Sequence, residues 1–226
     1  MLGFSVSELP FLIIQVALVL VATVLHELAH AATANALGDP TAKEQGRLTI
    51  NPLAHLDPVG SVLLPFLMSL AHGPIFAFAK PVPYNPNRLR SPIRDEVLVA
   101  LAGPACNLVQ ALAGTAAYRV AYAVFVNVNI DVSVALFILQ LLSAYLYLNL
   151  MLMFFNLIPL PPLDGSAIIS PFLRGKARYW YYQVQRYSMP VLLAIMFLVP
   201  MVLKFNPLGW YLNMTAGNLT DLLLGI

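Results

Sequence analysis

Charged residues are scarce in this sequence. Asp, Glu, Lys and Arg together make up only 10% of the 226 residues, whereas 60% are hydrophobic and the mean hydropathy is +0.79. A soluble domain typically carries about 25% charged residues, so the composition argues against one and indicates a polytopic membrane protein. The small net charge of +2 and the lack of a basic run with interleaved aromatics give no reason to expect nucleic acid as a partner.

Cysteine is almost absent as well. Because Cys106 is the only one, a disulfide within the chain is excluded and a zinc site built from cysteines is disfavoured. The first apolar stretch also lacks the basic segment that opens a signal peptide, so we do not expect it to be cleaved.

Long apolar stretches are plentiful. A membrane-spanning helix needs about 20 apolar residues, and four stretches meet or nearly meet this length: 10–36, 97–126, 132–158 and 188–205. A fifth, 59–72, is short and contains Pro65, which favours a re-entrant or interfacial segment. We therefore expect an all-α polytopic membrane protein with about four spanning helices, forming a single domain over residues 1–226.

Basic residues cluster in two connecting regions, 37–96 and 159–187. These regions hold ten of the twelve: Lys43, Arg47, Lys80, Arg88, Arg90, Arg94, Arg174, Lys176, Arg178 and Arg186. The positive-inside rule places both regions on the cytoplasmic side and the N-terminus outside, provided that 59–72 returns to the side it entered from.

The sequence HELAH places three ionisable residues inside the first apolar stretch. His26 and His30 are four residues apart, so on a helix they project from one face and can bind one metal ion. Glu27 lies about 100° around the helix, where it is suited to act as a general base rather than a ligand. The alternative is a helix–helix hydrogen-bond cluster or a proton relay, although ionisable groups are costly in lipid.

A catalytic zinc ion usually has three protein ligands, and two histidines with one carboxylate are a known set. Asp164 in PPLDGS is the best third candidate, because it follows a long apolar helix and lies between Pro162 and Gly165, which allow the backbone to bend. Asp57 in HLDPVG is a second candidate, although Asp-Pro is also a common turn signal.

Three motifs together resemble the site-2 protease family of intramembrane zinc metalloproteases. They are HELAH, then LAGPACN at 101–107, similar to the family's Gly-Pro-x-x-Asn element, and then NLIPLPPLDG. The resemblance covers about residues 20–170, within a catalytic core of about 10–170, and is closest to the compact bacterial and archaeal branch that lacks PDZ and CBS domains. It implies that His26, His30 and Asp164 bind one zinc ion and that Glu27 activates water.

The same resemblance implies that Asn107 and Asn156 lie near the substrate, where a side-chain amide can stabilise an oxyanion. A purely structural role, in which both residues tie helices together, stays open.

A small β-hairpin or sheet element is also expected near the active site. GRLTINP at 46–52 and IFAFAKPVP at 75–83 have strand character, and an exposed edge there would pair with an extended substrate segment. A self-contained hairpin that only caps the site is an equal alternative. His55 lies between these segments, either near the metal or substrate or facing the surface.

These observations predict a zinc-dependent intramembrane endopeptidase, embedded in a bacterial or archaeal cell membrane with its active site toward the cytoplasm. Its partners would be the lipid bilayer and a transmembrane protein substrate. Two alternatives remain: an inactive relative that binds membrane proteins, and an ion or proton transporter that uses the His-Glu-His cluster. The sequence does not determine the oligomeric state.

Overall fold

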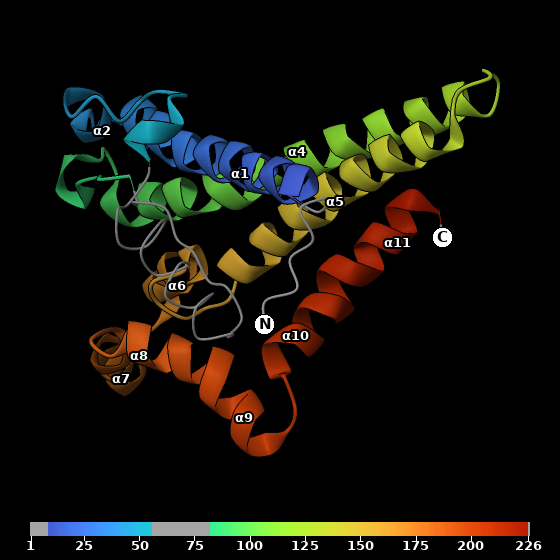
Figure 1. Cartoon of the computed structure of the whole chain (residues 1–226). Coiled ribbons are helices and arrows are strands. Elements are labelled where there is room, and N and C mark those ends of the chain that lie inside the picture. Colours follow the sequence, from blue (N-terminus) through green and yellow to red (C-terminus); the bar gives the residue numbers. More distant parts are fainter. Residues whose placement is uncertain (1–8, 56–81, 226) are drawn as a thin grey trace. The chain divides into compact units, whose positions relative to one another are not determined.

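Every regular element in the described part of the chain is a helix. The computed structural model describes residues 9–55 and 82–225, and the chain divides into two compact units (Figure 1). We call Thr23–Gly103 the short unit, and Met1–Ala22 with Pro104–Ile226 the long unit.

Three helices are much longer than the others: α1 (Leu9–Ala36), α4 (Pro92–Phe125) and α5 (Val132–Asn156). The short elements before α4 are α2 (Thr41–Glu44), η2 (Pro52–Ala54) and η4 (Pro86–Arg88). After α5 come α6 (Asp164–Ile169), η5 (Ser170–Phe172), α7 (Gly175–Gln185), α8 (Ser188–Leu193), the π-helical η6 (Ala194–Leu198), α9 (Val199–Leu203), α10 (Pro207–Leu212), the π-helical η7 (Asn213–Gly217) and α11 (Asn218–Leu224).

Among the described residues, three helical segments are long and apolar enough to cross a membrane: Ile14–Ala36, α4 and α5. A fourth span forms only if Ser188–Leu203 and Pro207–Leu224 count as one, and these two are bent by 106°. The bend follows from Lys204, which ends α9 in the left-handed conformation, and from Pro207, which starts the next helix. The predicted helical membrane architecture is thus confirmed, and the expected number of about four spans compares with three to four in the described residues. The stretch 59–72 lies outside the described residues.

The short unit packs mainly through small side chains. Ala34 at the end of α1 packs with Leu89 and Val99 in one buried cluster. Ala31, one turn earlier, packs with Ala42 and Val82 in another. Small residues let backbones approach closely, and this closeness brings main-chain groups of α4 within reach of α1 side chains.

The long unit has a larger apolar core. Leu146, Leu150 and Met153 of α5 pack against Ala111 of α4 and Ala216 of η7. Arg119 of α4 donates two hydrogen bonds, of 3.1 and 2.7 Å, to the Leu223 carbonyl, which satisfies an acceptor at the end of α11.

The strand expected over 46–52 does not form, so this part of the β prediction is wrong. Instead, the segment makes turns and bends that side chains close. His55 Nε2 contacts the Thr49 carbonyl at 2.8 Å, and Arg47 donates to the Ala54 carbonyl. The first bond occupies a carbonyl that a strand here would need, and the Asn51 side chain accepts from Leu53 N to start η2.

The second expected strand, 75–83, falls outside the described residues except for its last two, Val82 and Pro83. Neither of these two residues is in a strand. A small β element near the active site therefore receives no support from the described residues.

Candidate metal centre

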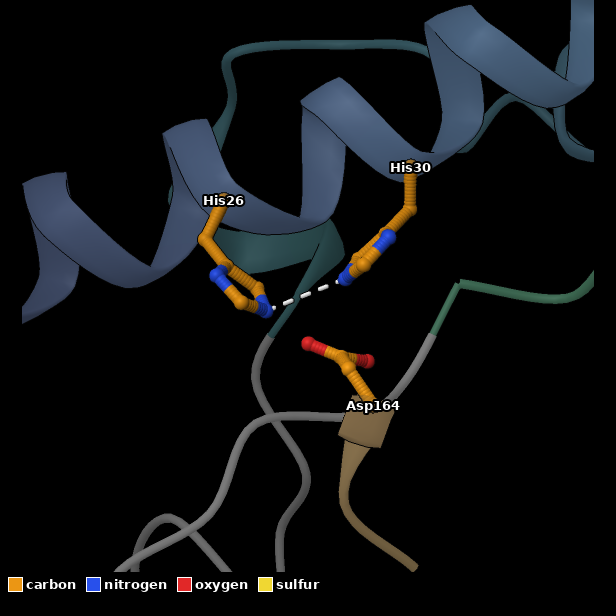
Figure 2. A group of neighbouring side chains, drawn as sticks. All are labelled: His26, His30 and Asp164. Atoms are coloured by element: carbon orange, nitrogen blue, oxygen red, sulfur yellow. Dashed lines mark hydrogen bonds between the residues drawn. The ribbon is translucent and has the colours of Figure 1, made fainter. Parts of the chain in front are cut away.

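Two histidines on one face of α1 are in direct contact. The Nε2 atoms of His26 and His30 lie 3.0 Å apart, and the two rings meet edge to face (Figure 2). The i, i+4 spacing on a helix produces this arrangement, as the sequence predicted. His26 is only 6% exposed, whereas His30 is half-buried.

A main-chain carbonyl fixes the ring of His30. Its Nδ1 lies 2.6 Å from the carbonyl oxygen of Val99 in α4. Because a carbonyl can only accept, we assign the proton to Nδ1, and Nε2 then carries the lone pair that a metal needs. Histidine ligands of metal sites are commonly oriented in this way by a second hydrogen bond.

The spacing of the two nitrogens fits zinc. Two imidazole nitrogens bound to one tetrahedral zinc ion at about 2.0–2.1 Å would be about 3.3 Å apart. The observed 3.0 Å is close to this value. Without a metal, Nε2 of one ring can donate a hydrogen bond to Nε2 of the other. When neither Nε2 carries a proton, both can bind one cation. The pair is therefore suited to contribute two ligands to one metal ion.

Glu27 is oriented by a main-chain donor. Its Oε2 accepts a hydrogen bond of 2.9 Å from the backbone N–H of Val82. Val82 is itself buried against Ala31 and Ala42, so this donor is held in place by packing. This contact could not be predicted from the sequence, because almost any residue type can supply a backbone N–H.

Asp164 is the first residue of α6, directly after a compact turn in the long unit. The turn includes a cis peptide bond between Pro161 and Pro162 and a 2.9 Å bond from Leu163 N to the Leu160 carbonyl. A side chain at Gly165 would collide with the carbonyls of Leu157 and Ile158, so the chain can close here only with glycine. The start of α6, and with it Asp164, is thereby fixed within this unit.

Asn107 and Asn156 take part in contacts between and within helices. Asn107 is fully buried in α4 and donates a 2.9 Å hydrogen bond to Asn149 of α5. Asn156, at the end of α5, donates to the Leu152 carbonyl at 3.0 Å. The Asn107 contact agrees with the helix-tying alternative, whereas the Asn156 bond stays within α5. The substrate-binding role of both residues stays a prediction.

A buried polar network surrounds Asn107. The Tyr145 hydroxyl donates to Gln110 at 2.6 Å, and Gln110 donates at 3.4 Å to the Ala22 carbonyl of α1. Ala22 lies one helical turn before His26. The signal for this network was present in the sequence as polar residues within apolar helices, which usually find partners when buried in a membrane protein.

The structure describes one of the two other ligand candidates, His55, but not Asp57. His55 is 1% exposed and its Nε2 faces the Thr49 carbonyl, so the surface-facing alternative is wrong. Asp57 lies outside the described residues.

Asp39 is a buried acid that stabilises the chain just after α1. Asp39 is fully buried and accepts hydrogen bonds from the Thr41 hydroxyl and from the backbone N–H groups of Asn85 and Thr41. Although burial alone raises the pKa of this carboxyl, the hydrogen bonds outweigh it and hold the pKa below its usual value. The carboxylate therefore ties the end of α1 to the segment that carries Val82.

Comparison with known proteins identifies relatives of one kind. Residues 122–199 match Peptidase family M50. The Bacillus subtilis protein named "Putative zinc metalloprotease YwhC" is 38% identical over 210 residues, which cover 93% of this chain and 87% of that protein. The Mycobacterium tuberculosis protein named "Putative zinc metalloprotease Rip2" is 30% identical over 192 residues, covering 85% of this chain and 67% of that protein. The Rip2 protein of Mycolicibacterium smegmatis is 30% identical over 158 residues, or 68% and 55% of the two chains. No solved structure gives a significant match.

Proposed function

Because this chain belongs to peptidase family M50, the site-2 protease family, we propose that it hydrolyses peptide bonds in or near membrane-spanning segments of other membrane proteins. The enzyme class predicted from the sequence, a zinc metalloendopeptidase, is confirmed by the family and by the relatives. The zinc cofactor is confirmed on the same grounds.

The contact between His26 and His30 is the observation that carries the proposal. Their Nε2 atoms lie 3.0 Å apart on a helix long and apolar enough to span a membrane. A metal site on such a helix is suited to substrates that are themselves within the membrane. Three to four apolar helices support embedding in the bilayer.

We assign the third zinc ligand to Asp164. It is the carboxylate that the sequence analysis favours as the partner of His26 and His30, and the start of α6 fixes its place within the long unit. Two histidines and one carboxylate form a known catalytic zinc set that keeps a fourth position open.

Each residue then has a distinct role. Zinc bound by this set supplies Lewis acidity, which polarises the scissile carbonyl and makes water easier to deprotonate. Glu27 takes the proton of the attacking water on a carboxylate oxygen and later delivers it to the leaving amine. The N–H of Val82 orients that carboxylate. Asn107 and Asn156 would contact the substrate backbone or the developing oxyanion.

The orientation in the membrane follows from the basic residues. Those of the short unit include Lys43, Arg88, Arg90 and Arg94, all exposed and all close in sequence to the ends of α1 and α4. We infer that this side faces the cytoplasm of a bacterial or archaeal cell, and that water reaches the zinc from there.

Two measurements on purified protein test the proposal. We expect about one zinc ion per chain, by elemental analysis, in both the wild type and the Glu27→Gln variant, because Gln keeps the size of the side chain and its acceptor for Val82 N–H. In proteoliposomes with single-span reporter proteins, the wild type should cut in or beside the span, and Glu27→Gln should be slower by about 10²–10⁴-fold. Mass spectrometry locates the cuts.

Other outcomes point to the alternatives. Zinc without any cleavage of spans would indicate an inactive, membrane-protein-binding relative. No zinc after loading, together with pH-dependent ion flux in the same liposomes, would indicate a transporter.

A further inference from the structure

Gly103 of α4 lies against both metal-binding rings of α1. A Cβ atom placed at this residue would be 2.6 Å from His26 Nε2 and closer still to His30 Nε2. Carbon atoms in contact with other heavy atoms are normally about 3.5–4.0 Å away. Both rings therefore lie directly against the bare Cα of this glycine, and a methyl group at this position would overlap with them.

The backbone of Gly103 does not itself require glycine. The residue lies inside α4, where its conformation is helical and alanine would be the better helix former. The requirement comes only from the space that the two imidazoles need. This separates Gly103 from Gly38 of the same unit, whose φ of +111° demands glycine for the backbone alone.

Val99 explains why the rings cannot simply avoid this residue. Its carbonyl holds Nδ1 of His30 at 2.6 Å, and it lies one helical turn before Gly103 on the same face of α4. Anchoring one edge of the imidazole at Val99 directs the opposite edge, with Nε2, over Gly103. The two residues thus act together, one by fixing the ring and the other by leaving room for it.

We propose that Gly103 is a positioning residue of the zinc site, and that it keeps open the space in which both Nε2 atoms face one metal ion. A methyl group there forces at least one ring to turn away. The zinc then loses a ligand, although the helix keeps its fold. This inference rests on the proposed zinc site and concerns a residue that binds neither metal nor substrate through a side chain.

The test compares two alanine substitutions in one helix. Gly114 also lies in α4, but a Cβ there would meet its nearest neighbour, Tyr145, at an ordinary 3.4 Å. We expect the wild type and Gly114→Ala to hold about one zinc ion per chain, and Gly103→Ala to bind zinc at least about 100-fold more weakly. Competition with a chelator measures the affinity, and far-UV circular dichroism checks that the helices are intact.

A second comparison keeps the test decisive if Gly103→Ala lowers stability. Adding Gly103→Ala to the double variant His26→Ala/His30→Ala should leave the thermal midpoint unchanged, because the rings that it would strike are gone. A drop as large as that in the single variant would overturn the inference. Wild-type zinc affinity in a folded Gly103→Ala would also overturn it while leaving the proposed function intact. A wild type without zinc would defeat both.

Discussion

The two units bury different kinds of polar residue. The short unit buries five ionisable side chains among its described residues: His26, Asp39, Arg47, His55 and Asp95. In the long unit, the buried polar side chains that the structure describes are amides and hydroxyls: Asn107, Gln110, Thr115, Asn149 and Thr220. Neutral groups need only hydrogen-bond partners to be buried, whereas ionisable groups also lose the solvation of their charge.

This difference suggests that the long unit mainly provides a stable framework, whereas the short unit carries most of the reactive groups. The long unit packs α4, α5 and the C-terminal helices around Leu146 and Leu150 and links them by neutral polar contacts. The short unit has smaller clusters, rich in alanine, and its ionisable groups are held largely by main-chain atoms of Val99, Val82, Asn85 and Thr49. Groups that bind a metal or transfer protons are ionisable, and in the short unit backbone N–H and C=O groups hold such side chains in place.

The largest effect is expected for Asp164, an ionisable residue of the long unit that we nevertheless assign to the metal site. We expect Asp164→Ala to lose stoichiometric zinc and all measurable cleavage, because two histidines alone leave the site one ligand short. Elemental analysis and the liposome assay measure both effects. Full zinc content and activity would exclude Asp164 as a ligand and make Asp57 or His55 the next candidate.

A smaller effect is expected at Asp39, which stabilises the short unit without touching the metal. Asp39→Asn should lower the free energy of unfolding by about 1–3 kcal/mol at pH 7, because an amide cannot accept all the hydrogen bonds of the carboxylate. Since the folded-state pKa of Asp39 lies below its usual value, its contribution is complete above about pH 4 and is lost as the pH falls further.

Thermal unfolding of wild type and Asp39→Asn, followed from pH 7 down to pH 3, checks this prediction. The gap between the two midpoints should shrink in acid. A gap that stays constant across that range would mean that the charge on Asp39 contributes nothing.

The smallest effect is expected in the neutral network of the long unit. Tyr145→Phe removes the 2.6 Å bond to Gln110 but leaves the ring, and polar contacts between membrane helices contribute on average about 0.6 kcal/mol. Zinc content and cleavage should stay within about twofold of the wild type. A large loss of activity would show that this network, through Ala22, also positions His26.

Several features were determined by local sequence alone. The apolar stretches predicted α1 and α5 to within two residues, and α4 except for its first turn, because a long run of apolar side chains needs internally satisfied hydrogen bonds in a membrane. The contact between His26 and His30 also followed from sequence, since a spacing of four places two side chains on one helix face.

Tertiary structure decided the rest. The expected strand at 46–52 depended on a partner strand, and the structure instead closes the segment with His55 and Arg47. Three backbone features position the side chains of HELAH: the carbonyl of Val99, the N–H of Val82 and the missing Cβ of Gly103. The first two are main-chain groups and do not depend on the side chains of Val99 and Val82. The sequence identifies the chemistry of each side chain. It does not show which backbone groups will lie beside that side chain, because this depends on how distant segments pack together.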